Sequence, residues 1–217
     1  MLLITTASAF SVSGHLERVF NDYAKDELQY FEEVAFRDDR LYRWRRPIVI
    51  TQEGANNKSA APVLERMINE VQPLLGDLSI SLQSGRGNLI IHHPAIVADY
   101  ARRYSEAGPL PLGYAIPQLL GSEITHVDIY LHPLLLPEKR EEVLKHEICH
   151  ALGLLQHTST PYPEYNLLGI PASLPQVKDK TSHPYFSRLD KAALRLLYDK
   201  RLRPNFSKRD FLRKTAL

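Results

Sequence analysis

Two histidines and a glutamate near residue 150 form the most chemically specific pattern in this chain of 217 residues. They stand in the run His146-Glu147-Ile148-Cys149-His150, which has the spacing H-E-x-x-H. On a helix, residues four positions apart share one face, so both imidazoles can bind the same ion. From the composition, a chance match is expected in about one such chain in fifty. The pattern therefore predicts a metal site on a helix.

Zinc is the ion that this pattern predicts, and Glu147 stands directly beside the first histidine. Zinc lowers the pKa of a coordinated water to roughly 7, so hydroxide becomes available near neutral pH. The neighbouring carboxylate can take up the proton of that water. We therefore expect a zinc-dependent hydrolase, with Glu147 as the general base and an amide carbonyl as its target.

A catalytic zinc site takes a third protein ligand and keeps its fourth position open. His157 is the favoured candidate, because Gly153 allows the chain to turn sharply after the helix and return toward the metal. Gln156 is one alternative. Glu164, a carboxylate from later in the chain, is the other.

Two elements must position these residues. A helix is predicted over 137–152, with Pro137 in its first turn, acidic residues near its start and Gly153 at its end. The preceding run 124–131 alternates apolar and polar residues, which predicts a half-buried strand. We expect this strand to line the cleft and to pair with an extended peptide substrate.

The rest of the chain predicts an α+β fold with a mixed sheet. Apolar periodicity and turn residues divide it into the following elements: helices over 14–36, 59–75, 94–104 and 189–198; strands over 48–50, 78–82 and 88–92; loops over 106–121 and 158–187. A glycine-rich turn joins the strands at 78–82 and 88–92. In the last loop, Tyr162, Tyr165 and Tyr185 could donate a hydrogen bond to an oxyanion, although simple packing is the commoner role for such rings.

Composition limits the partners. With 44% apolar and 24% charged residues, the chain has the composition of a globular protein. A net charge of +2 gives no overall field for nucleic acid, although Tyr42-Arg43-Trp44-Arg45-Arg46 is a local basic run. No stretch reaches the ~18 to 20 apolar residues of a membrane span. We expect a peptide or protein substrate, no nucleic acid and no membrane span; the oligomeric state is not predicted.

Three segments follow from these patterns. Residues 1–44 form an N-terminal helical segment, residues 45–206 the metallopeptidase domain, and residues 207–217 a C-terminal tail. The start Met1–Ala9 has a small-x-small sequence but no basic region and only a short apolar run. It fits either the remnant of a signal peptide or a plain chain end.

The run from His146 to His157 resembles the extended metzincin motif H-E-x-x-H-x-x-G-x-x-H. It departs by one residue, because the third metzincin histidine would fall at Gln156. Metzincins also place a methionine beneath the metal, whereas the methionines here, Met1 and Met67, both precede the motif. These departures favour a zincin-like protein outside the classical metzincins.

Three further stretches resemble a bacterial family of unknown function whose members are described as secreted or lipid-anchored relatives of zincin metallopeptidases. The stretches are 42–48, 151–154 and 189–204, and the resemblance covers about residues 40 to 206. It implies a zincin-like domain in a periplasmic or secreted protein.

Many members of that family lack one or both motif histidines and carry an acidic residue where His157 stands. The present chain retains the full H-E-x-x-H, which favours an active enzyme. The alternative is a catalytically silent descendant, a metal-binding or protein-interaction module without turnover.

Overall fold

A five-stranded mixed sheet organises the protein in the computed structural model, which describes residues 19–54, 57–101, 110–169, 186–203 and 205–215. The strand order is β4-β3-β5-β7-β6, with β7 and β6 antiparallel and the other neighbours parallel. The strands have these bounds: β3 Ile48–Gly54, β4 Ile80–Leu82, β5 Leu89–His93, β6 Gly113–Leu120 and β7 Glu123–Leu131. The edges of the sheet are therefore β4 and β6.

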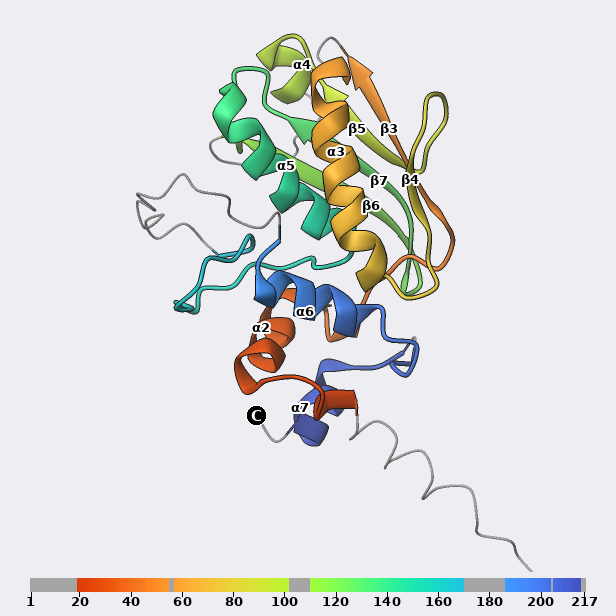
Figure 1. Ribbon diagram of the computed structural model, residues 1–217, viewed down its shortest axis with the longest axis vertical. Helices are drawn as coiled ribbons and strands as arrows, with labels where there is room; N and C mark the ends of the chain where they lie inside the picture. The colour runs from red at the N-terminus through yellow and green to blue at the C-terminus, as the bar shows by residue number, and fades with distance from the viewer. Residues whose placement is uncertain (1–18, 55–56, 102–109, 170–185, 204, 216–217) are drawn as a thin grey trace, which may run out of the picture.

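Two long helices cross the sheet in the view of Figure 1. They are α3, Asn57–Val71, which continues as a short 3-10 turn over Gln72–Leu74, and α5, Pro137–Ala151. Apolar residues of the sheet such as Ile50, Ile91 and Ile129 are at most 1% exposed. A short helix α4, Val97–Ala101, lies at the end of the sheet reached by β3.

A second layer of helices lies beyond one end of the sheet and contains both early and late parts of the chain (Figure 1). It consists of α2 Lys25–Ala35, α6 Arg188–Leu197 and α7 Lys208–Thr215, with a small hairpin of β1 Phe36–Arg37 and β2 Arg40–Leu41. The rings of Phe20, Phe31 and Phe36 surround Phe211 of α7. Residues 208–215, which the sequence leaves in a tail, thus contribute to the core.

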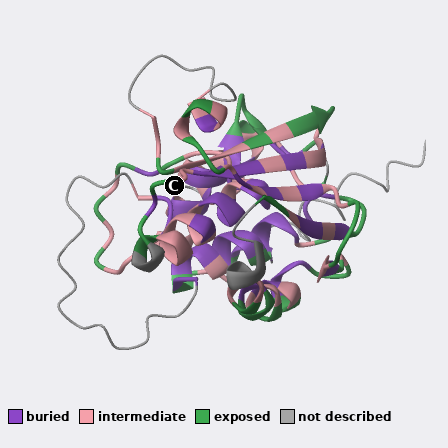
Figure 2. Ribbon diagram, turned by 90° about the horizontal axis from the view of Figure 1, so that it is seen from above, coloured by how far each residue is buried: buried purple, intermediate pink, exposed green. Residues whose placement is uncertain are grey.

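Buried residues run without a break from the sheet into this second layer (Figure 2). The predicted α+β class and mixed sheet are confirmed. The helices predicted over 137–152 and 189–198 and the strand over 124–131 are confirmed as α5, α6 and β7. Among the described helices, none combines the length and the apolar character needed to cross a bilayer.

Three expectations from the sequence are wrong. Strands β4 and β5 do not pair across the glycine-rich turn, because β3 lies between them. The second half of the predicted loop 106–121 is strand β6. The proposed substrate strand β7 is paired on both sides, to β5 and to β6, so it has no free edge for a peptide. Residues 1–18, 102–109 and 170–185, including Tyr185, lie outside the described residues.

Candidate metal centre

Helix α5 carries the motif and is fixed to the sheet by its apolar face. Leu144, Ile148 and Ala151 are at most 2% exposed, and Pro137 occupies the first turn. His146 and His150 are partly exposed on a different face. Burial of the apolar stripe thus fixes the orientation of the helix, and both imidazoles lie on a face that stays accessible.

The end of α5 is held by residues from distant segments. The indole Nε1 of Trp44 donates to the Ala151 carbonyl at 2.7 Å, and the Tyr198 hydroxyl donates to the Leu152 carbonyl at 2.9 Å. These donors satisfy carbonyls that have no partner within the helix. At Gly153, φ is +106°, and a Cβ there would stand 2.3 Å from the Tyr42 carbonyl oxygen. Only glycine fits this turn.

Three imidazole nitrogens converge after this turn. The Nε2 atom of His150 lies 3.1 Å from that of His146 and 3.2 Å from that of His157, and the other pair is 3.1 Å apart. Among the described residues, these three histidines are the one group of potential ligands clustered tightly enough to hold a metal ion.

Hydrogen bonds fix the proton on two of these rings. His146 donates from Nδ1 to the Leu167 carbonyl, and His150 donates from Nδ1 to the Leu154 carbonyl, each at 2.6 Å. A neutral imidazole carries one ring proton, so Nε2 of both residues presents a lone pair. Because these lone pairs are 3.1 Å apart, they repel each other. A cation that accepts both would relieve this repulsion.

The donor set suits zinc. Two nitrogens bound to one tetrahedral zinc ion at about 2.0–2.1 Å stand about 3.3–3.4 Å apart. The observed separations of 3.1–3.2 Å lie close to this value. The bonds from Nδ1 to backbone carbonyls are also the support that ligating histidines commonly have.

Burial keeps the three rings neutral. It lowers the pKa of His146 and of His157 below the ordinary histidine value, and it lowers the pKa of His150 to about 3, with neighbouring histidines adding to the shift. Imidazole binds a metal in its neutral form. The cluster therefore needs little deprotonation to accept a cation at neutral pH.

Glu147 lies beside the cluster and is 4% exposed. Burial raises the pKa of its carboxyl group to about 8. Strand β6 packs directly on it: a Cβ at Gly113 would stand 3.0 Å from Oε1 of Glu147 and 2.7 Å from Val143. The absence of a side chain at Gly113 thus leaves room for the carboxylate.

Two cavities meet at this carboxylate. One of about 500 Å³ is mainly apolar; its lining includes Leu112, Val143, Tyr165 and Leu167. The other, of about 340 Å³, is lined by residues of β6, by His150 and by Arg37. Gly113, His146, Glu147 and His157 line both cavities, and His150 lines the smaller one beside the edge strand.

Helix α2 holds the segment that carries His157. The backbone N–H of Gln156 donates to the Val34 carbonyl at 3.0 Å. Glu33 accepts hydrogen bonds from the hydroxyls of Thr158 and Thr160, the latter at 2.7 Å. Residues on both sides of His157 are thus attached to one helix, which directs the ring toward the other two.

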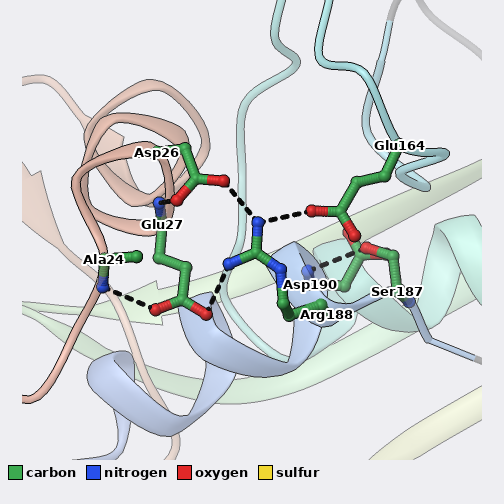
Figure 3. Close-up of polar contacts among 7 residues, drawn as sticks. All are labelled: Ala24, Asp26, Glu27, Glu164, Ser187, Arg188 and Asp190. Carbon is green, nitrogen blue, oxygen red and sulfur yellow. Dashed lines mark hydrogen bonds and ion pairs between the residues drawn. The ribbon is translucent and has the colours of Figure 1, made fainter.

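Glu164, an alternative third ligand, is engaged in other contacts. Glu164 forms an ion pair with Arg188 at 2.6 Å, and Arg188 also contacts Asp26 and Glu27 of α2 (Figure 3). Glu164 does not belong to the cluster of three histidines, and the backbone of Gln156 is bound to the Val34 carbonyl. His157 is the candidate that the structure groups with His146 and His150.

The basic run 42–46 is used in internal contacts. Arg43 donates to the carbonyls of Leu197 and Leu202, at 2.8 and 2.9 Å, and Trp44 is 2% exposed. Arg46 pairs with Glu123 at 2.9 Å. Arg43, Trp44 and Arg46 therefore contribute to the packing and ion pairing of the fold.

Three polar residues with long-range contacts were not predicted: Tyr30, Glu33 and Asp190. Tyr30 donates to Asp190, 160 residues away, and Glu33 accepts from Thr158, 125 residues away, so no local spacing indicates these contacts. The available indication of such a contact is a hydrophilic residue within an otherwise apolar stripe of a helix.

No known family model matches the chain, and no curated protein matches its sequence. The function must therefore be argued from the geometry of this site.

Proposed function

We propose that the protein is a zinc-dependent hydrolase of amide bonds, with a zincin-like domain that acts on peptides or proteins. His146, His150 and His157 would hold the metal. The observation that carries the proposal is the convergence of three Nε2 atoms within 3.2 Å, with the proton of two rings fixed on Nδ1. Bound zinc would polarise a carbonyl group and lower the pKa of a coordinated water to roughly 7.

Glu147 is the general base in this proposal. Its carboxylate takes up the proton of the attacking water and returns it to the leaving amine. Burial alone raises its pKa to about 8. A cation on the three histidines opposes this shift, because a nearby positive charge favours the carboxylate form. Glu147 can then accept a proton at neutral pH.

The substrate backbone would lie along β6. This strand is at the edge of the sheet, and its first residue, Gly113, lines both cavities beside Glu147. An extended peptide can add to such an edge through main-chain hydrogen bonds. The apolar cavity of about 500 Å³ suits a large apolar side chain next to the cleaved bond.

Glu147→Gln tests the mechanism. The variant keeps the size of the side chain but cannot take up a proton, so we expect zinc to bind normally and peptide cleavage to fall by a factor of about 10² to 10⁴. Zinc content is measured by elemental analysis and cleavage with a peptide library. Zinc-bound wild type with no more activity than the variant would support a silent metal-binding module instead.

Absence of stoichiometric zinc in the wild type, with no effect of added zinc on the melting temperature, would contradict the metal assignment itself. The two results are distinct, so the metal site and the reaction are tested separately.

A further inference from the structure

Asp190, in the first turn of α6, is a fully buried carboxylate that the proposed reaction does not use. It accepts hydrogen bonds from the Tyr30 hydroxyl at 2.5 Å, from the Ser187 hydroxyl at 2.6 Å and from the backbone N–H of Ser187 at 3.0 Å. The backbone N–H of Leu167 donates to both of its oxygens, at 3.2 and 3.3 Å. Every one of these partners is a donor, and a carboxylate only accepts.

Helix capping explains only part of this arrangement. Ser187 and Asp190 form a capping box at the start of α6, and Figure 3 shows the two side chains in contact. This motif needs only the Oδ2 atom of Asp190. The Oδ1 atom contacts Tyr30 and Leu167, which are 160 and 23 residues away in the chain. A cap alone would not require these partners.

Leu167 connects Asp190 to the metal cluster. Its N–H donates to Asp190, and its carbonyl accepts the Nδ1 proton of His146 at 2.6 Å. The position of this carbonyl determines how the imidazole rotates and where its Nε2 atom points. The next carbonyl, that of Leu168, accepts the backbone N–H of Thr158 at 2.9 Å, immediately after His157. The segment 167–168 therefore binds the ring of His146 directly and holds the residue that follows His157.

We propose that Asp190 is a positioning residue for the metal centre, which holds Leu167 so that its carbonyl fixes the ring of His146. This inference rests on the proposed function, because it assumes that the three histidines bind zinc. Asp190 touches neither the histidines nor a substrate in this role. Its effect passes through the backbone of Leu167.

Asp190→Asn tests the proposal with almost no change in size. The new amide group places N–H donors where the carboxylate accepts the backbone N–H groups of Leu167 and Ser187, so we expect the Leu167 backbone to shift. We expect zinc affinity to fall by about 10- to 100-fold, the range found when supports behind metal ligands are removed. Affinity is measured by competition with a coloured chelator, and the visible spectrum of the cobalt-substituted protein reports ligand geometry without reference to activity.

Ile80→Val serves as the control for a general loss of stability. Ile80 is a buried residue of β4, at the edge of the sheet opposite β6, and its change to valine removes one methylene group from the core. While a variant stays folded, lower global stability does not change the affinity of its folded state. We therefore expect Ile80→Val to bind zinc as the wild type does, with the same cobalt spectrum.

Tyr30→Phe provides a second test should Asp190→Asn fail to fold. It removes one donor to Oδ1 and leaves the Asp190 carboxylate in place. We expect about a threefold loss of zinc affinity, below the effect of Asp190→Asn. If the folded variants bind zinc like the wild type and keep its cobalt spectrum, Asp190 has no positioning role. A wild type that binds no zinc would instead contradict the proposed function.

Discussion

The ring proton of His146 and that of His150 lie on Nδ1, and this decides what the cluster can bind. Both Nε2 atoms then present lone pairs toward the Nε2 atom of His157. A proton on His157 could satisfy one of these lone pairs but not both, whereas a metal ion accepts all three. The cluster is therefore suited to a cation rather than to a hydrogen-bonded network.

His157→Ala tests the third ligand. We expect zinc affinity to fall by more than about 100-fold, because even the loss of a support behind a ligand costs 10- to 100-fold. Glu164→Gln and Gln156→Ala are the matched controls, and both should retain the affinity of the wild type. A large loss in Glu164→Gln with none in His157→Ala would assign the third ligand to the carboxylate.

The motif predicted His146 and His150, and the turn at Gly153 favoured His157, although the metzincin spacing itself pointed to Gln156. His146, His150 and His157 lie within twelve positions of one another, and the helix and the turn at Gly153 determine where they point. Their supports were not predictable in this way. Asp190 acts through Leu167, and neither residue belongs to a local pattern that includes the histidines.

At the scale of elements, Gly153 determines how the chain leaves α5. We expect Gly153→Ala to lower the free energy of unfolding by at least about 2 kcal/mol more than Gly85→Ala does, because only the former adds a steric clash to backbone strain. The two glycines have nearly the same φ, +106° and +105°, but a Cβ at Gly85 would meet nothing within 4 Å. Urea unfolding of the two variants measures the difference, and equal losses would contradict the role of the clash.

The turn also sets the position of Leu154, whose carbonyl accepts the Nδ1 proton of His150. A distortion at Gly153 should therefore weaken zinc binding as well as stability, whereas Gly85→Ala should leave zinc binding unchanged. This second measurement separates a local effect on the metal centre from a general loss of stability.

Strand β6 shows where sequence patterns fail for whole elements. Its neighbourhood is rich in proline and glycine, which favours a loop. Pro117 is nevertheless tolerated, because an edge strand needs only one row of backbone hydrogen bonds. Leu119 and Leu120 are exposed, so the strand also lacks the clear alternation that predicts burial on one face. By contrast, β7 is half-buried, and the alternation of apolar and polar residues along it correctly predicts a strand.

At the scale of the whole molecule, buried histidines link stability to pH. His93, which is 3% exposed, has its pKa lowered to about 4, mainly by burial and further by the charge of Arg140. An exposed histidine titrates near 6.5. As pH falls from about 6.5 to 4, the unfolded chain therefore takes up a proton before the folded protein does. We expect His93 to contribute a loss of stability of up to about 3 kcal/mol over this range.

Urea unfolding between pH 7.5 and 4, with a chelator present, measures this effect. His93→Gln should have a weaker pH dependence than the wild type, because the variant lacks the group whose pKa burial lowers. Parallel curves for the wild type and His93→Gln would show that His93 does not contribute. Zinc should add stability near neutral pH and lose this effect in acid, as its ligands become protonated.

The segment 156–168 contacts both α2 and α6, so the metal centre can be completed only after both helices have been synthesised. The supports of the metal centre include Tyr30 at one end of the chain and Asp190 near the other. Because synthesis proceeds from the N-terminus, the H-E-x-x-H helix is synthesised before α6. A nascent chain can therefore present His146 and His150 but cannot yet hold Leu167 in place. If the chain binds zinc as proposed, the metal should therefore reach its final coordination only after α6 has been translated.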